Sequence, residues 1–338
     1  MSGRKGPVFV LGCPRSGTTV LYHMLLSAGD FAIYRAESNV FSVMVPRFGN
    51  LRSERNRRRL MQYWLQSKLF YVSGLNANEI ESRIMRDCRN GGDFLRVVME
   101  SIAAKQGVSR WADCTPDHLL YLDEIREQVP DARIIHIIRD GRDVALSYVK
   151  QGWSYPLPWD RLEHLAVAGL YWEWIVRRGQ RDGRKFGDRY REVRFEDLVG
   201  SPRETLASLS EFVGQELDYD HIQQVGVGSV KEPNSSFSNS GDGKFNPVGR
   251  WRSQYSDEQL AGIENVIGAF LEELGYPLMT KPKRDLRVAR LRAEYIPFFS
   301  AKRWLKDCTP LGRYTSIRRM EIGTPEQSLQ VSAPGKSQ

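Results

Sequence analysis

Short apolar runs alternate along the chain with longer stretches in which apolar residues recur at helical spacing. The first run, at residues 8–11, ends at Gly12, and residues 18–27 then carry apolar side chains three and four positions apart. A strand buried on both faces of a parallel sheet is continuously apolar, whereas the second spacing places apolar side chains on one face of a helix. The pattern predicts a strand, a loop and a helix over residues 8–27.

Two more strands follow from the same pattern. Residues 134–138 form an apolar run after a helix that Thr115 is expected to cap, and residues 143–150 resume as a helix. A third strand is predicted at residues 190–195, before a helix that starts with a capping-box sequence at Ser201. Strands that alternate with helices form a parallel sheet, because each helix carries the chain back to the end where the next strand begins. We therefore predict a three-layer α/β/α domain with a central parallel sheet.

Three helices or helical inserts and one long loop complete the prediction. An aromatic-rich helix is expected at 155–178 and a basic one at 52–70, and inserts of this kind commonly form the walls of a substrate cleft. Residues 226–249 are rich in Gly, Ser and Asn, which predicts a long loop. Residues 256–274 predict a helix that begins at a serine and ends before Gly275.

Composition narrows the class of protein. The chain has 338 residues, of which 41% are apolar and 11% aromatic, so it can bury the core of one large globular domain. Lys and Arg number 49 against 41 Asp and Glu, and this net charge of +8 suits a polyanionic ligand such as a nucleotide. Nucleic acid and an anionic membrane surface suit the same charge. Composition therefore argues against a disordered chain but leaves the ligand open.

The cysteines show neither a metal-ligand spacing nor a Cys-x-x-Cys pair, so neither a disulfide framework nor a metal site is predicted. The apolar run after Arg4 and Lys5 is far too short for a signal-peptide core or a membrane span. We expect a cytoplasmic protein in a reducing compartment. The cysteines are Cys13, Cys88, Cys114 and Cys308.

The loop after the first strand has the spacing of a phosphate-binding loop. Gly12 and Gly17 enclose four residues, but the Lys-Ser/Thr pair that follows in nucleotide triphosphatases is replaced by Thr18 and Thr19. Backbone N–H groups and the start of the next helix can still hold an anion, and Arg15 supplies positive charge inside the loop. The sequence thus predicts a phosphate cradle without the lysine that a triphosphate requires.

A second motif links this loop to a family. Arg139 follows the second strand, and Ser147 lies eight residues further on. Together with Pro-Arg-Ser-Gly-Thr-Thr at 14–19, this arrangement resembles the sulfotransferases that use 3′-phosphoadenosine 5′-phosphosulfate. Phe-Glu-Asp-Leu at 195–198 is similar to that family's Tyr-Glu-Asp-Leu segment, and Gly-Arg-Trp-Arg at 249–252 is similar to its C-terminal nucleotide-binding loop.

The resemblance covers residues 7–276 and implies a fold like that of the P-loop nucleotide hydrolases. It places a sulfotransferase domain at residues 1–280. Residues 281–338 are then a basic C-terminal extension, and the Ser, Pro and Gly residues at its end predict a flexible tail.

The resemblance implies transfer of a sulfuryl group from 3′-phosphoadenosine 5′-phosphosulfate to an acceptor hydroxyl by in-line displacement. Arg15 would stabilise the charge that develops on the leaving phosphate, a role that needs a cation but no Mg²⁺. Arg139 at a strand end and Ser147 two helical turns later can hold the 3′-phosphate from two sides. Phe195 can stack on adenine but lacks the hydroxyl of the family's tyrosine. The predicted donor-binding residues are Arg15, Ser16, Gly17, Thr18, Thr19, Arg139, Ser147, Phe195 and Arg250.

The catalytic base has three candidates. Glu37, shortly before a Pro-Arg pair, resembles the glutamate of the tyrosylprotein and heparan-type branch, so we predict Glu37 as the base and Arg15 as the catalytic cation. Asp113 and His118 are its competitors. Cys114 stands where the family usually carries a lysine, so a second cation at the sulfuryl group would have to come from another residue.

Other interpretations use the same residues. Arg139 can instead make an ordinary ion pair with Asp140 or Asp143. A P-loop kinase or ATPase, and a non-catalytic nucleotide- or RNA-binding protein, are the alternative functions, although no nucleic-acid motif is recognisable. The basic run at 52–59 is expected to be a solvated helix face. No nucleic acid partner and no transmembrane segment are expected, and the acceptor stays open between carbohydrate, lipid, peptide tyrosine and secondary metabolite.

Overall fold

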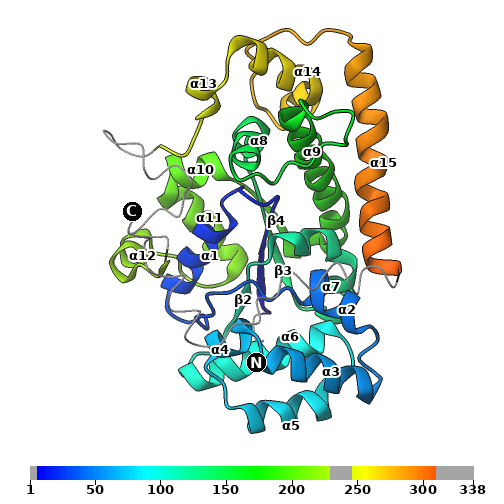
Figure 1. Ribbon diagram of the computed structural model, residues 1–338. Coiled ribbons are helices and arrows are strands. Elements are labelled where there is room, and N and C mark those ends of the chain that lie inside the picture. Colours follow the sequence, from blue (N-terminus) through cyan, green and yellow to red (C-terminus); the bar gives the residue numbers. More distant parts are fainter. Residues whose placement is uncertain (1–5, 229–245, 310–338) are drawn as a thin grey trace, which may run out of the picture.

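The computed structural model describes residues 6–228 and 246–309. At its centre lie four parallel strands in the order β2-β1-β3-β4 (Figure 1). The strands are β1 (Val8–Leu11), β2 (Ala112–Asp113), β3 (Arg133–Ile138) and β4 (Tyr190–Arg194). The predicted central parallel sheet is confirmed. Strand β2 was not predicted, because two residues are too few to show a pattern.

Helices cover both faces of the sheet. The α-helices are α1 (Thr18–Ser27), α2 (Val45–Phe48), α3 (Glu54–Leu65), α4 (Lys68–Ser73), α5 (Ala77–Asp87), α6 (Gly91–Gln106), α7 (Leu122–Gln128), α8 (Gly141–Lys150), α9 (His164–Gly183), α10 (Phe195–Gly200), α11 (Pro202–Val213), α12 (Tyr219–Val225), α13 (Trp251–Gln254), α14 (Asp257–Glu273) and α15 (Leu286–Cys308). Shorter turns of 3₁₀- or π-helix lie at Val40–Met44, Pro116–Tyr121 and Arg184–Arg189.

The sheet separates two apolar clusters. Alternate side chains of a strand point to opposite faces, so Phe9 and Leu11 of β1 lie in one cluster while Val8 and Val10 lie in the other. The first cluster includes side chains of α6, α9 and α15, and the second includes side chains of α1, α11 and α12. Figure 1 shows α11 and α12 on one side of the sheet and α15 on the other. The three predicted layers are therefore present.

The elements with strong local signals have the predicted positions. Helix α1 begins at Thr18 and ends at Ser27, as the spacing of its apolar residues predicts. Helix α14 begins with a capping box in which Ser256 and Gln259 exchange hydrogen bonds, and Gly275 follows its end with a φ of +76°. Only glycine adopts this conformation without strain, which is why the helix stops there.

Two predicted helices are different in the structure. Helix α9 begins at His164, whereas the sequence predicted a start at 155, because Pro156 and Pro158 lack N–H donors and bias their preceding residues away from helical angles. The basic helix predicted at 52–70 is two helices, α3 and α4, separated at Ser67, whose side chain accepts from the N–H of Phe70 and caps α4.

Two predicted caps are also wrong. The side chain of Ser201 makes no cap hydrogen bond. This one residue lies between the end of α10 and the start of α11, and its N–H donates to Asp197 O at 2.8 Å. Thr115 precedes a 3₁₀ turn, and its hydroxyl bonds to Asp113 instead of capping that turn. Most of the loop predicted at 226–249, and the tail after residue 309, lie outside the described residues.

The start of the predicted C-terminal extension is a long helix. Helix α15 runs beside α9 (Figure 1), and its Leu291, Tyr295 and Phe299 are buried in the same cluster as the core of the sheet. The residues before position 280 thus share their core with residues after it. The domain boundary predicted at residue 280 stays a prediction.

Candidate active site

Three strand ends meet at the carboxyl edge of the sheet. Leu11, the last residue of β1, pairs with His136 of β3, and Ile138 at the end of β3 pairs with Arg194 of β4. Open parallel sheets bind their ligands at this edge. The fold therefore brings together the loop after β1 and the residues that follow β3 and β4.

The loop after β1 turns sharply into α1. Arg15 and Gly17 have positive φ angles of 73° and 94°, and the N–H of Ser16 donates to Cys13 O at 3.0 Å. Gly17 has no substitute, because a β-carbon there would lie 2.3 Å from the ring of Phe195. The first N–H groups of α1 lack intrahelical acceptors and form the positive end of the helix dipole. The loop thus has the geometry of an anion cradle.

The side chain of Arg15 reaches across to the second motif. Its Nε donates to the hydroxyl of Ser147 at 2.9 Å, and its guanidinium lies 5.7 Å from the ring centre of Trp153. Ser147 is buried in α8. The residue predicted at the sulfuryl group and a residue predicted at the 3′-phosphate are therefore one hydrogen bond apart.

Arg139 is a buried cation at the end of β3, with 9% of its surface exposed. Its Nη1 donates to Arg15 O at 3.0 Å, and its Nη2 donates to Pro247 O. The carboxylate of Asp143 lies 3.7 Å from Nη2, and the Phe195 ring centre lies 4.6 Å from the guanidinium. The ion pair that the sequence allowed is thus present, but it is buried. The Nε of Arg139 is buried without a hydrogen-bond partner, which suits an anionic ligand.

The other loop side chains differ in exposure. The hydroxyl of Ser16 is buried without a hydrogen-bond partner, and Thr18 is buried against Cys114, with which it shares a hydrogen bond. Thr19 is exposed at the start of α1. Phe195 is buried between Gly17 and Arg139, so its predicted contact with adenine stays a prediction.

Positive charge is concentrated here. Burial lowers the pKa of Arg15, and the nearby charge of Arg139 lowers it further. The pKa of Arg250 is lowered by the same two causes, burial and then Arg139. Like charges at this proximity disfavour one another unless an anion lies among them. The arrangement therefore favours a ligand with more than one negative charge.

Asp143 connects the segment at 249–252 to this site by hydrogen bonds. Its carboxylate accepts from the N–H of Gly249 at 2.8 Å and from that of Trp251 at 3.1 Å. Trp251 is 1% exposed, with its ring centre 3.8 Å from the guanidinium of Arg142 and 4.4 Å from that of Arg252. Burial raises the pKa of Asp143, and the charge of Arg139 partly lowers it.

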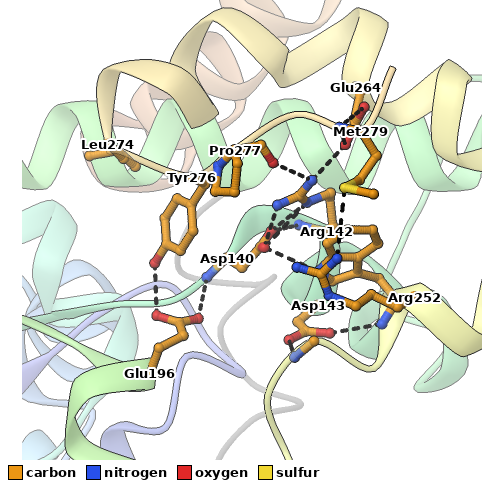
Figure 2. Close-up of polar contacts among 12 residues, drawn as sticks. Asp140, Arg142, Asp143, Glu196, Arg252, Glu264, Leu274, Tyr276, Pro277 and Met279 are labelled. Atoms are coloured by element: carbon orange, nitrogen blue, oxygen red, sulfur yellow. Dashed lines mark hydrogen bonds and ion pairs between the residues drawn. The ribbon is translucent and has the colours of Figure 1, made fainter. Parts of the chain in front are cut away.

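A buried ionic network supports this loop (Figure 2). Arg142 bonds to Asp140 at 2.7 Å and to Glu264 of α14 at 2.5 Å, and Asp140 also accepts from the indole of Trp251 at 3.1 Å. Glu196 of the Phe-Glu-Asp-Leu segment accepts from the N–H of Asp140 at 2.9 Å. Sequence reasoning treated Asp140 and Asp143 only as partners of Arg139, and it gave no role to Arg142 or Glu264. The dense charge run at 139–143 was the available signal, whereas nothing in α14 marks Glu264.

Two of the three candidate bases form a buried pair. His118 Nδ1 lies 2.9 Å from the carboxylate of Asp113, and its Nε2 accepts from the N–H of Phe41 at 3.2 Å. Both ring nitrogens therefore have protein partners, with Nδ1–H as donor and Nε2 as acceptor. Thr115 donates its N–H to the same carboxylate at 3.2 Å. The polar atoms of Asp113 and His118 are thus engaged with one another and with the protein around them.

Glu37, the predicted base, lies at the surface near the loop after β1. It is exposed, and its backbone carbonyl accepts from the side chain of Asn39 at 3.0 Å. The pKa of Cys114 is raised well above its usual value, first by burial and then by the charges of Asp113 and Glu37. Glu37 is therefore near Cys114, which itself bonds to Thr18 of the loop. The position of the family's lysine is a buried thiol in this chain.

An exposed aromatic segment borders Arg15. Trp153 is 44% exposed, and Tyr155 and Trp159 further along are 69% and 67% exposed. Helix α15 fixes this segment, because the hydroxyl of Tyr295 in α15 accepts from the N–H of Leu157 at 2.8 Å. Trp153, two residues before the insert predicted at 155–178, thus lies beside Arg15 of the loop after β1.

Within residues 6–228 and 246–309, no three His, Cys, Asp or Glu side chains gather in a group that could hold a metal ion. In the same residues, no helix is long and apolar enough to cross a membrane.

The fold and the site define a class: an α/β protein with a P-loop-like anion cradle that lacks the triphosphate lysine. The sequence profile of the Sulfotransferase family matches residues 7–219, so this chain belongs to that family and is a sulfotransferase. The predicted family is confirmed, and the predicted P-loop-like fold with it.

Known proteins are similar to this chain in sequence or in structure. Nodulation protein NoeE of Sinorhizobium fredii (strain NBRC 101917 / NGR234) is 25% identical over 306 residues, which cover 82% of this chain and 67% of that protein. The sulfotransferase domain from the Synechococcus PCC 7002 olefin synthase has a TM-score of 0.50 at 18% identity, covering 82% of this chain and 98% of that chain. At this identity the likeness shows the fold alone.

Proposed function

We propose that this sulfotransferase moves a sulfuryl group from 3′-phosphoadenosine 5′-phosphosulfate to an acceptor hydroxyl by in-line displacement. The observation that carries the proposal is the meeting of Arg15, Arg139 and Arg250 around a cradle that has no triphosphate lysine. A donor with a phosphosulfate and a separate 3′-phosphate needs two anion subsites. These arginines offer them.

The 5′ end of the donor binds at the loop after β1. Backbone N–H groups at the start of α1, with Ser16 and Thr19, hold the 5′-phosphate, and Arg15 stabilises the negative charge on its leaving oxygen. The buried hydroxyl of Ser16 has no protein partner, so a phosphate oxygen at this position would satisfy it.

The 3′-phosphate binds between Arg139, Ser147 and Arg250. The buried Nε of Arg139 is an unused charged donor, and hydrogen bonds from such donors are about twice as strong as neutral ones. The hydroxyl of Ser147 accepts from the Nε of Arg15. Its hydroxyl can still donate its proton to a phosphate oxygen.

Glu37 is the proposed base. Its carboxylate takes the proton of the acceptor hydroxyl while that oxygen forms a bond to sulfur. The bond from sulfur to the 5′-phosphate oxygen breaks, and 3′,5′-bisphosphoadenosine leaves with the electron pair. Exposure and proximity to the loop support Glu37, and the buried pairing of Asp113 with His118 disfavours both competitors.

Binding calorimetry tests the donor. We expect 3′,5′-bisphosphoadenosine to bind and ATP–Mg²⁺ to bind far more weakly, and a clear preference for ATP would identify a P-loop kinase or ATPase instead. Arg139→Ala should weaken 3′,5′-bisphosphoadenosine by about 10- to 100-fold, the loss of one or two charge-assisted hydrogen bonds, and affect adenosine 5′-phosphosulfate much less. Arg203→Ala removes an exposed arginine that pairs with Asp220 and serves as the control. Equal losses for both nucleotides would contradict the role of Arg139.

The acceptor is proposed to bind beside Trp153, in contact with the segment at 151–163. Carbohydrate, lipid, peptide tyrosine and secondary metabolite are the classes to test. A screen with isotopically labelled donor, read by the mass shift of the product, identifies the class. Trp153→Ala should then raise KM for that acceptor and leave the affinity for 3′,5′-bisphosphoadenosine unchanged.

A further inference from the structure

We propose that Asp143 is a positioning residue that fixes Arg250 opposite Arg139 and thereby builds the 3′-phosphate subsite. The inference rests on the proposed function, because that function identifies the anion. Asp143 itself touches no donor atom in this scheme. It acts through the turn at 249–251 and through Arg139.

Asp143 bonds to the backbone on either side of Arg250 in the sequence. One carboxylate oxygen accepts from the N–H of Gly249 at 2.8 Å, and the other accepts from the N–H of Trp251 at 3.1 Å. These are the residues directly before and after Arg250, so one side chain fixes the backbone from which Arg250 projects. The side chain of Asp143 is 1% exposed, and water therefore cannot replace it at these two N–H groups.

A fixed turn matters here because the two arginines repel each other. The charge of Arg139 lowers the pKa of Arg250, whereas the charge of Asp143 raises it. A turn held only by its own chain would move Arg250 away from Arg139. Asp143 lies 3.7 Å from Arg139 and accepts from the turn, so a single carboxylate holds both arginines in place.

The side chain of Trp251 gives the same turn a second attachment, to the network of Asp140, Arg142 and Glu264 (Figure 2). The indole N–H of Trp251 donates to Asp140 at 3.1 Å, and its ring lies over Arg142, which Asp140 and Glu264 fix in turn. Asp140 caps the N-terminus of α8, and Asp143 lies in the first turn of that helix. The turn is therefore attached to the same helix that carries Ser147.

Two roles for Asp143 predict opposite signs in one measurement. If Asp143 acted only through its charge, Asp143→Asn would remove a negative charge beside an anion site and tighten binding of 3′,5′-bisphosphoadenosine. If Asp143 positions the turn, its amide can accept one N–H but its NH₂ group faces the other, so the turn loosens. We then expect binding to weaken about tenfold or more, which corresponds to the loss of one charge-assisted hydrogen bond.

The experiment measures calorimetric affinities of the wild-type chain and its variants for 3′,5′-bisphosphoadenosine and adenosine 5′-phosphosulfate. Asp143→Asn should weaken the bisphosphate selectively, while the nucleotide without a 3′-phosphate keeps its affinity within about twofold. Asp197→Asn, the same charge change at an exposed site in α10, is the control. Trp251→Phe keeps an aromatic ring but removes the bond to Asp140, and it should give the same selective loss by a route that leaves Asp143 intact.

The outcomes separate the inference from the function on which it rests. If the wild-type chain fails to bind 3′,5′-bisphosphoadenosine, the proposed function is refuted. If the wild-type chain binds it but Asp143→Asn and Trp251→Phe bind it equally well or more tightly, the positioning role is overturned and the function stands. An equal loss for both nucleotides also overturns it, since a merely structural residue would give that result.

Discussion

His136 makes the stability of this protein depend on pH in a way that can be calculated. Its imidazole is fully buried on β3, and burial lowers its pKa from 6.5 to about 3. Tyr190 donates its proton to Glu192 at 2.8 Å, so the contact of 2.7 Å between His136 Nδ1 and the Tyr190 oxygen is an N–H donation from the imidazole. The Nε2 atom is buried without a partner, and a proton added there would have no acceptor.

The sign follows from which state binds the proton. As the pH falls below about 6.5 the unfolded chain protonates His136, whereas the folded imidazole stays neutral until about pH 3. The unfolded state therefore gains protons first, and the free energy of unfolding decreases across this window. At pH 5 the difference is about 1.5 pH units, and at about 1.4 kcal/mol per unit the loss is about 2 kcal/mol relative to pH 8.

His136→Phe tests this value, because phenylalanine has a ring of similar size and no proton to bind. Repacking around the new ring changes the variant's free energy of unfolding at pH 8. Relative to the wild type, the variant's free energy of unfolding should nevertheless rise by about 2 kcal/mol between pH 8 and pH 5. Urea unfolding at several pH values, followed by circular dichroism, measures it. The buried carboxylates titrate in both proteins and cancel in the difference.

His221→Phe, the same substitution at an exposed residue of α12, is the control for the introduction of a phenylalanine. Parallel curves for the wild type and His136→Phe would refute the reasoning, because they would show that the folded chain accepts a proton at His136 as easily as the unfolded chain does.

Three further predictions concern the base, the buried network and the C-terminal helix. Glu37→Gln should lower turnover by about 10²- to 10⁴-fold with unchanged affinity for 3′,5′-bisphosphoadenosine, and a collapse in Asp113→Asn alone would move the base there. Glu264→Ala leaves the buried charge of Arg142 without one of its two carboxylates, so the free energy of unfolding should fall by about 3–5 kcal/mol in denaturant titrations. A chain ending at residue 280 should be unfolded or aggregated by circular dichroism and gel filtration, whereas one ending at 309 should fold, because α15 buries three large side chains of the core. A folded, active 1–280 chain would instead establish the boundary that the sequence predicted.

The fold was predictable wherever the signal is local. Residues 8–27 combine a continuous apolar run, two glycines and a helical period, and the structure has the predicted strand and helix there. The start of α9 was not predictable from its aromatic pattern. Pro156 and Pro158 disfavour a helix before it, and contacts with distant residues, such as the bond from Leu157 to Tyr295 and the ion pair of Asp160 with Arg290, fix the conformation there.

The residues of the candidate site also differ in how far the sequence predicted them. The loop and Arg139 were predicted to act together because parallel strands end at one edge, and the pairing of β1 with β3 places them there. The supporting residues were missed. Arg142 and Glu264 lie more than a hundred positions apart in the sequence, and no periodicity relates them.

The sequence posed a choice for Arg139 between an ordinary ion pair and a ligand contact, and the structure indicates that the choice was too narrow. Arg139 pairs with Asp143 in a buried site, yet its Nε has no partner and its neighbours are two more arginines. Arginine side chains that bind one anion together must be fixed in position beforehand, because mobile arginines repel each other and would separate. Under the proposed function, the carboxylate at 3.7 Å supplies that restraint and leaves the Nε of Arg139 available to a phosphate oxygen. Ion pairing at the edge of a parallel sheet is therefore compatible with ligand binding, and under the function proposed above it is the means by which the 3′-phosphate subsite is built.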